Sequence, residues 1–97
     1  MTDRVQFRPM QAEDLDRVVD LEQHAFSHPW TRALYLDALT SYECWMMYLD
    51  DQHVGHGVIS QVVDEAHLLN IAIAVEQQGK GLGLQLLEHL MQRASQR

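Results

Sequence analysis

The first part of the chain combines a short stretch of alternating apolar and polar residues with two stretches of helical periodicity. Residues 5–8 alternate and end at Pro9, which predicts a first strand. The next stretch has helical spacing and predicts a helix whose inward-facing stripe is Leu15, Val18, Val19, Glu22, Ala25 and Phe26. Residues 27–29 break this helix. Thr31 is a candidate N-cap for a second helix, with the stripe Leu34, Tyr35, Ala38 and Leu39.

The middle of the chain has the pattern of an antiparallel meander. Aromatic and apolar residues predict a strand over 44–49, and residues 50–53 predict a hairpin loop that leads to a second strand over 54–63. A turn at Asp64 and Glu65 precedes a third strand over 66–73. Because the second half of this strand is almost continuously apolar, we expect it to be buried on both faces and central in the sheet.

A glycine-rich turn follows the third strand. Gln78-Gly79-Lys80-Gly81-Leu82-Gly83 leads to a last amphipathic helix over 84–97, with the stripe Leu84, Leu87, Leu90, Met91 and Ala94. Glycines let the backbone approach an anion closely, and the first N–H groups of a helix carry partial positive charge. The turn therefore predicts a cradle for a pyrophosphate.

The order of elements is β-α-α-β-β-β-α, which indicates an α+β chain of mixed α/β character with an antiparallel meander. A strand, glycine turn and helix of this kind normally lead through a right-handed crossover to a further parallel strand, and no such strand follows in the sequence. We therefore expect residues 1–97 to form a single, incomplete domain whose C-terminal strands are missing.

Charge and composition narrow the range of partners. The net charge of −7 argues against nucleic acid or an anionic membrane as the main partner. The sequence lacks an apolar run of the roughly 20 residues that cross a bilayer, and it lacks the order of a signal peptide. Its single cysteine, Cys44, excludes an internal disulfide, so we expect a cytoplasmic protein.

Three phosphate-binding motifs compete for the glycine turn. A P-loop requires Ser or Thr after Gly-Lys, whereas Gly81 follows Lys80. A dinucleotide fingerprint requires G-x-G-x-x-G and an acidic residue about twenty positions later, and neither is present. The pattern that remains is Q-x-x-G-x-G on Gln78, Gly81 and Gly83.

This pattern, entered from an antiparallel meander, resembles the motif with which N-acetyltransferases of the GNAT superfamily bind the pyrophosphate of coenzyme A. Other segments extend the resemblance over nearly the whole chain: Phe7-Arg8-Pro9-Met10, Ala25-Phe26 with Pro29-Trp30-Thr31, Asp64-Glu65-Ala66 with Leu69-Asn70-Ile71-Ala72, and Gly81-Leu82-Gly83 with Leu86-Leu87-Glu88-His89-Leu90. Within the superfamily, these segments are most similar to those of the bacterial ribosomal-protein-alanine N-acetyltransferases.

The resemblance implies acetyl-CoA as co-substrate and the N-terminus of a small-subunit ribosomal protein as acceptor. It implies that Ile71, Ala72 and Ile73 pair with the pantetheine arm and that the pyrophosphate is wrapped by Gln78, Gly79, Lys80, Gly81, Leu82, Gly83 and Leu84. Backbone amides then do most of the holding, and Lys80 adds a positive charge. The chain departs from the family pattern at Ala74-Val75 and at Gly79.

The resemblance assigns no catalytic residue within the chain. In this subfamily, a glutamate base and a tyrosine acid lie on the strand and helix after the glycine-turn helix, so we expect little or no activity from these 97 residues alone. Glu65 and His67 are the nearest alternatives for a base, but such residues are more often solvated or packed. Cys44 has no evident neighbouring base that would make it a nucleophile.

Two further groups of residues admit a functional interpretation. The histidine pairs 24/28 and 53/56 straddle a helix end and a hairpin, which argues against a metal site. The aromatic segment formed by Phe26, Pro29, Trp30 and Tyr35 either lines a groove for an acceptor peptide or packs into the core.

Three functions therefore stay open at the level of sequence. The first is acetylation of a ribosomal-protein alanine, and the second is acetylation of another amine, such as an antibiotic or a polyamine. The third is a non-catalytic coenzyme A-binding or association module. It follows from the strand over 66–73, whose outer edge has no predicted neighbour and so favours a homodimer.

Overall fold

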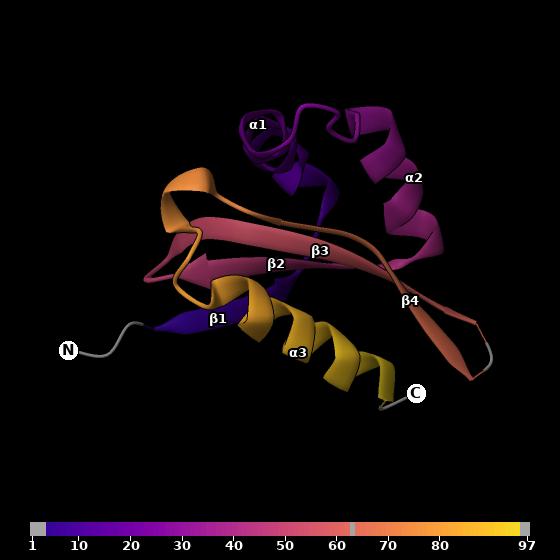
Figure 1. The fold of residues 1–97 in the computed structure, drawn as a ribbon. Coiled ribbons are helices and arrows are strands. Elements are labelled where there is room, and N and C mark those ends of the chain that lie inside the picture. The colour runs from indigo at the N-terminus through magenta and orange to yellow at the C-terminus, as the bar shows by residue number, and fades with distance from the viewer. Residues whose placement is uncertain (1–3, 63, 96–97) are drawn as a thin grey trace.

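In the part of the chain that the structure describes, four antiparallel strands form one sheet in the order β1-β2-β3-β4, with helices on both faces (Figure 1). The structure, a computed structural model, describes residues 4–62 and 64–95. The strands are β1 (Val5–Pro9), β2 (Glu43–Leu49), β3 (Gln52–Val62) and β4 (Glu65–Ile73), and the helices are α1 (Leu15–Ala25), α2 (Arg32–Ser41) and α3 (Leu82–Ser95). Short 3₁₀ turns precede α1 at Ala12–Asp14 and follow β4 at Val75–Gln77. The predicted element order and α+β class are confirmed.

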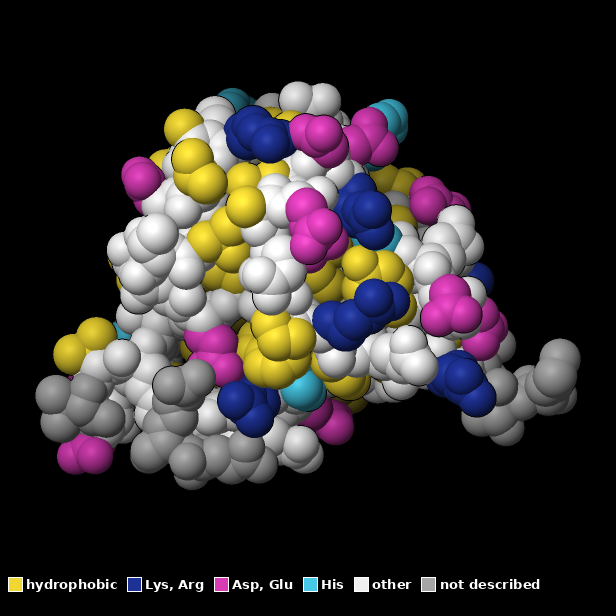
Figure 2. All heavy atoms as spheres, turned by 180° about the vertical axis from the view of Figure 1, so that it is seen from behind, with side chains coloured by type: hydrophobic (Ala, Val, Ile, Leu, Met, Phe, Trp, Pro, Cys, Tyr) yellow, Lys and Arg dark blue, Asp and Glu magenta, His cyan; other side chains and the backbone are white. Residues whose placement is uncertain are grey.

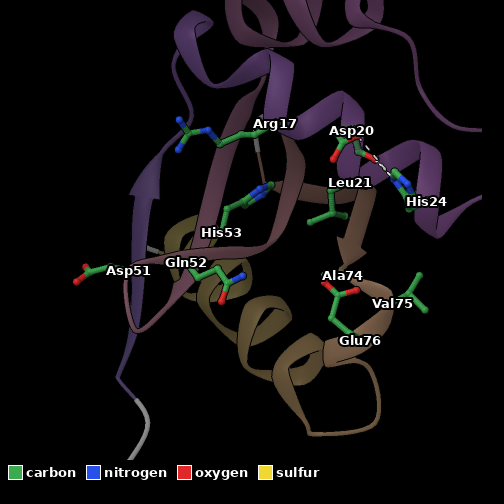
Figure 3. Close-up of a pocket in the computed structure, with 10 residues that line it drawn as sticks. All are labelled: Arg17, Asp20, Leu21, His24, Asp51, Gln52, His53, Ala74, Val75 and Glu76. Atoms are coloured by element: carbon green, nitrogen blue, oxygen red, sulfur yellow. Dashed lines mark hydrogen bonds and ion pairs between the residues drawn. The ribbon is translucent and has the colours of Figure 1, made fainter.

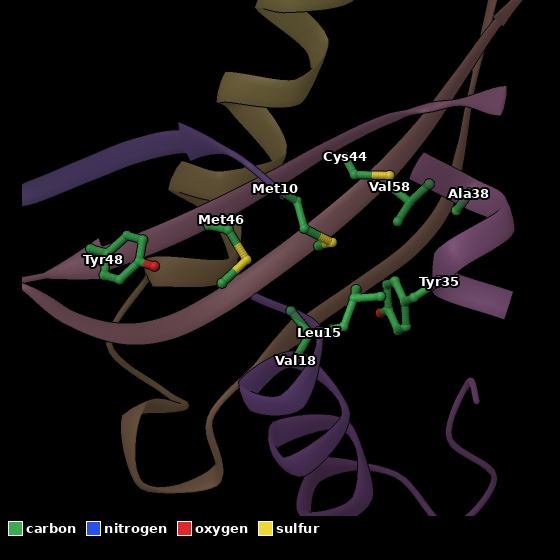
Figure 4. Close-up of a cluster of buried hydrophobic side chains, with 9 residues drawn as sticks. All are labelled: Met10, Leu15, Val18, Tyr35, Ala38, Cys44, Met46, Tyr48 and Val58. Carbon is green, nitrogen blue, oxygen red and sulfur yellow. The ribbon is translucent and has the colours of Figure 1, made fainter. Parts of the chain in front are cut away.

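Alternation along β2 divides the core into two layers. Cys44, Met46 and Tyr48 pack with residues of α1 and α2 on one face, as Figure 4 shows. Met47 lies in a second cluster on the other face, where α3 supplies the side chains Leu82, Leu86, Leu90 and Ala94. Because the side chains of a strand point alternately to opposite faces, the unbroken apolar run of β2 is explained by cover on both sides.

The N-cap prediction for the second helix is confirmed. Thr31 has an extended backbone, and its Oγ1 accepts a hydrogen bond from the backbone N–H of Leu34 at 3.2 Å. This bond satisfies one of the N–H groups that the first turn of a helix leaves without a partner. It fixes where the connection between α1 and α2 ends.

The hairpin between β2 and β3 is shorter than predicted. Asp50 and Asp51 alone form the turn, with φ of 51° and 68°, while Gln52 and His53 already pair with Leu49 and Tyr48. Positive φ at both central residues is the requirement of a type I′ turn, which matches the twist of the strands, and aspartate tolerates it better than most residues. The prediction of a four-residue loop was wrong. The last residue of the predicted second strand, Val63, lies outside the described residues.

The prediction that the third strand of the meander is central was also wrong. Within the described sheet, β4 is an edge strand that pairs with β3, and the central strands are β2 and β3. Ala72 is the buried residue of β4, whereas Leu68 and Leu69 are 42% and 37% exposed. The prediction took the apolar residues of 66–73 as a sign of burial on both faces, but Leu68 and Leu69 lie on the surface.

The buried stripe of α3 is rotated from the predicted one. The helix begins at Leu82, and Leu86 is fully buried, while Leu84 and Met91 are 62% and 48% exposed. Apolar residues occupy more than half the circumference of this helix, so periodicity alone did not fix its inner face. Residues 96 and 97 of the predicted helix lie outside the described residues.

On the side of the molecule seen in Figure 2, acidic and basic side chains are interspersed among hydrophobic ones. None of the described helices is both long enough and apolar enough to cross a membrane.

Candidate functional site

The predicted cofactor segment is continuous in space, because β4 leads directly through the glycine turn into α3 (Figure 1). Along β4, Ile71 and Ile73 pack on the α3 side of the sheet, and Ala72 packs with Leu21 of α1 on the other. These side chains are committed to the core. What they leave for a ligand is the outer backbone edge of β4, with which no strand pairs among the described residues.

The turn itself depends on glycine. Gly79 and Gly81 have φ of 83° and 82°, the left-handed region that glycine adopts without steric cost. A Cβ at either position would meet nothing within 4 Å, so backbone conformation rather than crowding requires glycine here. The side-chain amide of Gln78 donates to the carbonyl of Ile73 at 3.0 Å and fastens the turn to the end of β4.

The N-terminus of α3 follows this turn at once. The backbone N–H groups of its first residues, Leu82, Gly83 and Leu84, precede the first intrahelical bond and carry the positive end of the helix dipole. Lys80 is exposed beside them, and its Nζ donates to Gln77 Oε1 at 3.1 Å. The strand edge, the turn and the helix end together form a site suited to an extended ligand that ends in an anion.

A second feature is a buried carboxylate that sequence reasoning had placed among the apolar positions of the first helix. Glu22 of α1 has 0% exposure, and its Oε1 accepts hydrogen bonds from the Tyr35 hydroxyl at 2.6 Å, His56 Nε2 at 3.1 Å and Asn70 Nδ2 at 2.8 Å. Its Oε2 accepts the backbone N–H of Trp30 at 3.0 Å. The carboxylate therefore ties α1 to the α1–α2 connection, to α2, to β3 and to β4.

The network keeps Glu22 ionised. Burial by itself raises the pKa of the carboxyl, but the hydrogen bonds from His56, Tyr35 and the backbone of Trp30 outweigh it, so the pKa of Glu22 is lowered. Burial and the neighbouring carboxylate raise the pKa of Tyr35, so its hydroxyl remains a donor. The fold tolerates a buried carboxylate that accepts several hydrogen bonds, whereas removal of one of these donors destabilises the fold.

The network continues from His56 to His53, since His56 Nδ1 lies 3.2 Å from His53 Nε2. Burial, followed by the charges of His56 and Arg17, lowers the pKa of His53 to about 4. His53 also lines a cavity of about 550 Å³ between α1, the β2–β3 hairpin and the segment after β4 (Figure 3). At neutral pH, this cavity therefore has an uncharged imidazole in its wall.

Two further cavities lie beside β4, the first against the α1–α2 connection and the second against α2. One of about 250 Å³ is lined by Glu22, Phe26, Ser27, His28, Trp30 and Asn70. The other, of about 500 Å³, is lined by Trp30, Leu34, Asp37, Ala38, Ser41, Tyr42 and Leu69. The two interpretations of the aromatic segment therefore apply to different residues. Phe26 and Trp30 line cavities, whereas Tyr35 packs in the core.

The other candidate residues are placed less favourably for catalysis. His67 and Glu65 are exposed and contact each other at 3.2 Å. Cys44 is buried, and burial together with the charge of Glu43 raises the pKa of its thiol to about 11, which disfavours a thiolate nucleophile. Among the described residues, no group of three or more histidine, cysteine or carboxylate side chains is placed to hold a metal ion.

A protein-family profile, curated proteins and solved structures match the chain. The profile of the acetyltransferase (GNAT) family matches residues 15–97. The chain belongs to this family.

Among curated relatives, the ribosomal protein bS18-alanine N-acetyltransferase of Salmonella typhimurium is 34% identical over 79 residues, which cover 80% of this chain and 53% of that protein. The crystal structure of the ribosomal-protein-S18-alanine N-acetyltransferase from Escherichia coli superposes with a TM-score of 0.89 at 27% identity and covers 97% of this chain and 61% of that one. A GNAT family acetyltransferase from Elizabethkingia anophelis, solved with acetyl-CoA bound, has a TM-score of 0.74 at 26% identity and covers 95% and 58%. The chain therefore spans between half and two thirds of the length of these proteins.

Proposed function

We propose that this chain is the acetyl-CoA-binding part of an N-acetyltransferase that acetylates the N-terminal alanine of a small-subunit ribosomal protein in the cytoplasm. The observation that carries the proposal is the continuous path from the open edge of β4 through the turn at Gly79 and Gly81 to the N-terminus of α3. The similarity to bS18-alanine N-acetyltransferases supports the choice of acceptor.

The residues of this path fit the parts of acetyl-CoA. The backbone of Ile71, Ala72 and Ile73 offers the peptide groups of a strand edge, unpaired within residues 4–62 and 64–95, to the amides of the pantetheine arm. Residues 78–84 offer N–H groups at a helix N-terminus to the pyrophosphate, and Lys80 adds a positive charge beside it. The bound thioester supplies an acetyl group for attack by an amine.

An acceptor α-amino group is easily deprotonated near neutral pH, so the transfer does not require a strong base. A protein α-amino group has a pKa of about 7.7 to 8.0, so its deprotonation at neutral pH costs only about 1 kcal/mol. Positioning of the amine beside the thioester therefore contributes more than a strong base. None of the described residues is assigned as the base or acid of the transfer, and the proposal includes weak or absent turnover by these 97 residues alone.

An NMR titration of the ¹⁵N-labelled chain tests the cofactor assignment. Acetyl-CoA is expected to shift the backbone amides of residues 71–73 and 78–84 and to leave those of β1 unchanged, because β1 lies at the opposite edge of the sheet. Absence of shifts, or shifts confined to another region, would contradict the proposal. Competition between an alanine-starting ribosomal peptide, a polyamine and an aminoglycoside then separates the two enzymatic hypotheses.

One observation favours a second function, an association module. The outer edge of β4 is unpaired among the described residues, and its exposed Leu68 and Leu69 add apolar surface beside it. A second copy that adds its own β4 would extend the sheet and give a symmetric homodimer. Equilibrium sedimentation that shows a monomer at high concentration would count against this function.

A further inference from the structure

The hydrogen bonds around Glu22 determine which way the side-chain amide of Asn70 points. Asn70 Nδ2 donates to Glu22 Oε1 at 2.8 Å and to the Tyr35 hydroxyl oxygen at 2.8 Å. Ionised Glu22 can only accept, and the Tyr35 hydroxyl proton is directed to Glu22, so both neighbours require the NH₂ group on this side. The amide oxygen Oδ1 must then occupy the opposite corner of the amide plane.

That oxygen is left for a ligand. No hydrogen bond from any of the described residues to Asn70 Oδ1 is found, and Asn70 lines the cavity of about 250 Å³ together with Glu22 and Trp30. The register of β3 and β4 shifts beside this position: Val58 pairs with Asn70 and Ile59 pairs with Leu68, which leaves Leu69 as a bulge. Bulges re-aim neighbouring side chains and are frequent next to binding sites.

We propose that Asn70 binds the ammonium group of the acceptor through Oδ1, with Glu22 as the positioning residue that orients the Asn70 amide. This inference rests on the proposed function, in which the pyrophosphate lies at residues 78–84 and the pantetheine arm runs back along β4 from Ile73 to Ile71. The thioester at the far end of that arm then lies near Asn70, the residue before Ile71. An amine held by Asn70 is therefore delivered next to the acetyl group. The negative charge of Glu22, at one wall of the same cavity, adds electrostatic attraction for a cation.

The size of the cavity indicates which acceptors fit. A volume of about 250 Å³ lies below the range of about 300 to 1,000 Å³ that is common for drug-sized ligands. It has room for an amine with a small side chain. The apolar part of the cavity wall is formed by Trp30 and by Phe26, whose side chain is 39% exposed.

The test measures binding of a short alanine-starting peptide to the chain saturated with coenzyme A, beside the same peptide with an acetylated N-terminus. The wild-type chain is expected to prefer the free amine by about tenfold or more, the effect of one hydrogen bond to a charged group. Asn70→Leu should reduce this preference to about one, with coenzyme A affinity unchanged. Glu22→Gln should also reduce the preference to about one, and because it lowers stability it is judged by the ratio of the two peptide affinities alone. His67→Leu, on the same strand but exposed, is the matched control and should keep the wild-type preference.

The preference between the two peptides separates a binding role from a purely structural one, because a loss of stability weakens both peptides and coenzyme A alike. If a variant fails to fold, the wild-type chain still gives a result: its Asn70 side-chain NH₂ resonances should shift with the free-amine peptide and not with the acetylated one.

The outcomes distinguish the two proposals. Failure of the wild-type chain to bind coenzyme A overturns the proposed function. Coenzyme A binding without a preference for the free amine, a preference that survives in Asn70→Leu, or unshifted Asn70 resonances in the wild-type chain overturns the inference alone.

Discussion

Substitution of Glu22 by glutamine probes the buried network most directly, because it keeps the shape of the side chain and removes its charge. Three donors converge on Oε1 and one on Oε2. Whichever oxygen becomes the NH₂ group of glutamine, at least one donor then faces another donor. The fold tolerates this poorly, because the site has 0% exposure and water cannot substitute for the lost acceptor.

The magnitude follows from these contacts. A hydrogen bond to a charged group contributes about 1.5–3 kcal/mol, and a buried donor left without an acceptor costs about 1–3 kcal/mol. Glu22→Gln is therefore expected to lower the free energy of unfolding by about 3–5 kcal/mol at pH 7. For a chain of this size, whose total is about 5–15 kcal/mol, such a loss removes a large part of the stability.

Urea denaturation followed by circular dichroism measures the effect. The matched control is Glu65→Gln, which removes an exposed carboxylate that also contacts a histidine and should change stability by no more than about 0.5 kcal/mol. Because the pKa of Glu22 is lowered in the folded chain, its contribution is complete above the unfolded carboxyl pKa of about 4.3 and declines as the pH falls below it. Equal stability of the two variants at pH 7, or a difference that grows on acidification, would refute the reasoning.

Three other predictions concern the turn and the buried titratable groups. Gly81→Ala should lower the free energy of unfolding, measured by urea denaturation, by about 1–2 kcal/mol, because the φ of 82° at this position disfavours residues with a Cβ. Gly81→Asn should lower it by less, since asparagine tolerates this φ better than alanine. Equal losses in the two variants would show that φ is not the cause. With its pKa lowered to about 4, His53 binds a proton in the unfolded chain before the folded one, so stability should fall as the pH drops from about 6.5 to 4. His53→Phe should flatten that decline, and an NMR titration of His53 with a midpoint near 6.5 would contradict the assignment. Cys44, buried and with its pKa raised to about 11, should react with iodoacetamide at pH 8 only after denaturation, and labelling of the native chain would show that the site opens.

The sequence predicted the fold well where local signals agree with tertiary packing. The element order and the Thr31 cap follow from periodicity and capping chemistry, which act over a few residues. Periodicity alone did not determine the phase of α3, since Leu84 and Leu86 satisfy an apolar stripe equally well in the sequence. Contact with the sheet places Leu86 inside and leaves Leu84 on the surface.

The glycine turn of the candidate site was predictable from the sequence, but the hydrogen-bond network around Glu22 was not. The glycine turn is encoded in consecutive residues, so its motif identifies it. Glu22 occupied an apolar position of a helical stripe, and its partners His56 and Asn70 lie 34 and 48 residues further along the chain. A charged residue within an apolar stripe was the available signal, because such a residue must find buried donors or destabilise the fold.

The central claim is that backbone groups of the turn hold a pyrophosphate while the strand edge holds the arm attached to it. Calorimetry that compares coenzyme A with pantetheine, which lacks the phosphates, tests this claim most directly. Coenzyme A is expected to bind about 100-fold more tightly, because each charge-assisted hydrogen bond to a phosphate oxygen contributes more than a neutral one. Equal affinity for the two ligands, or no detectable binding of coenzyme A, would contradict the account.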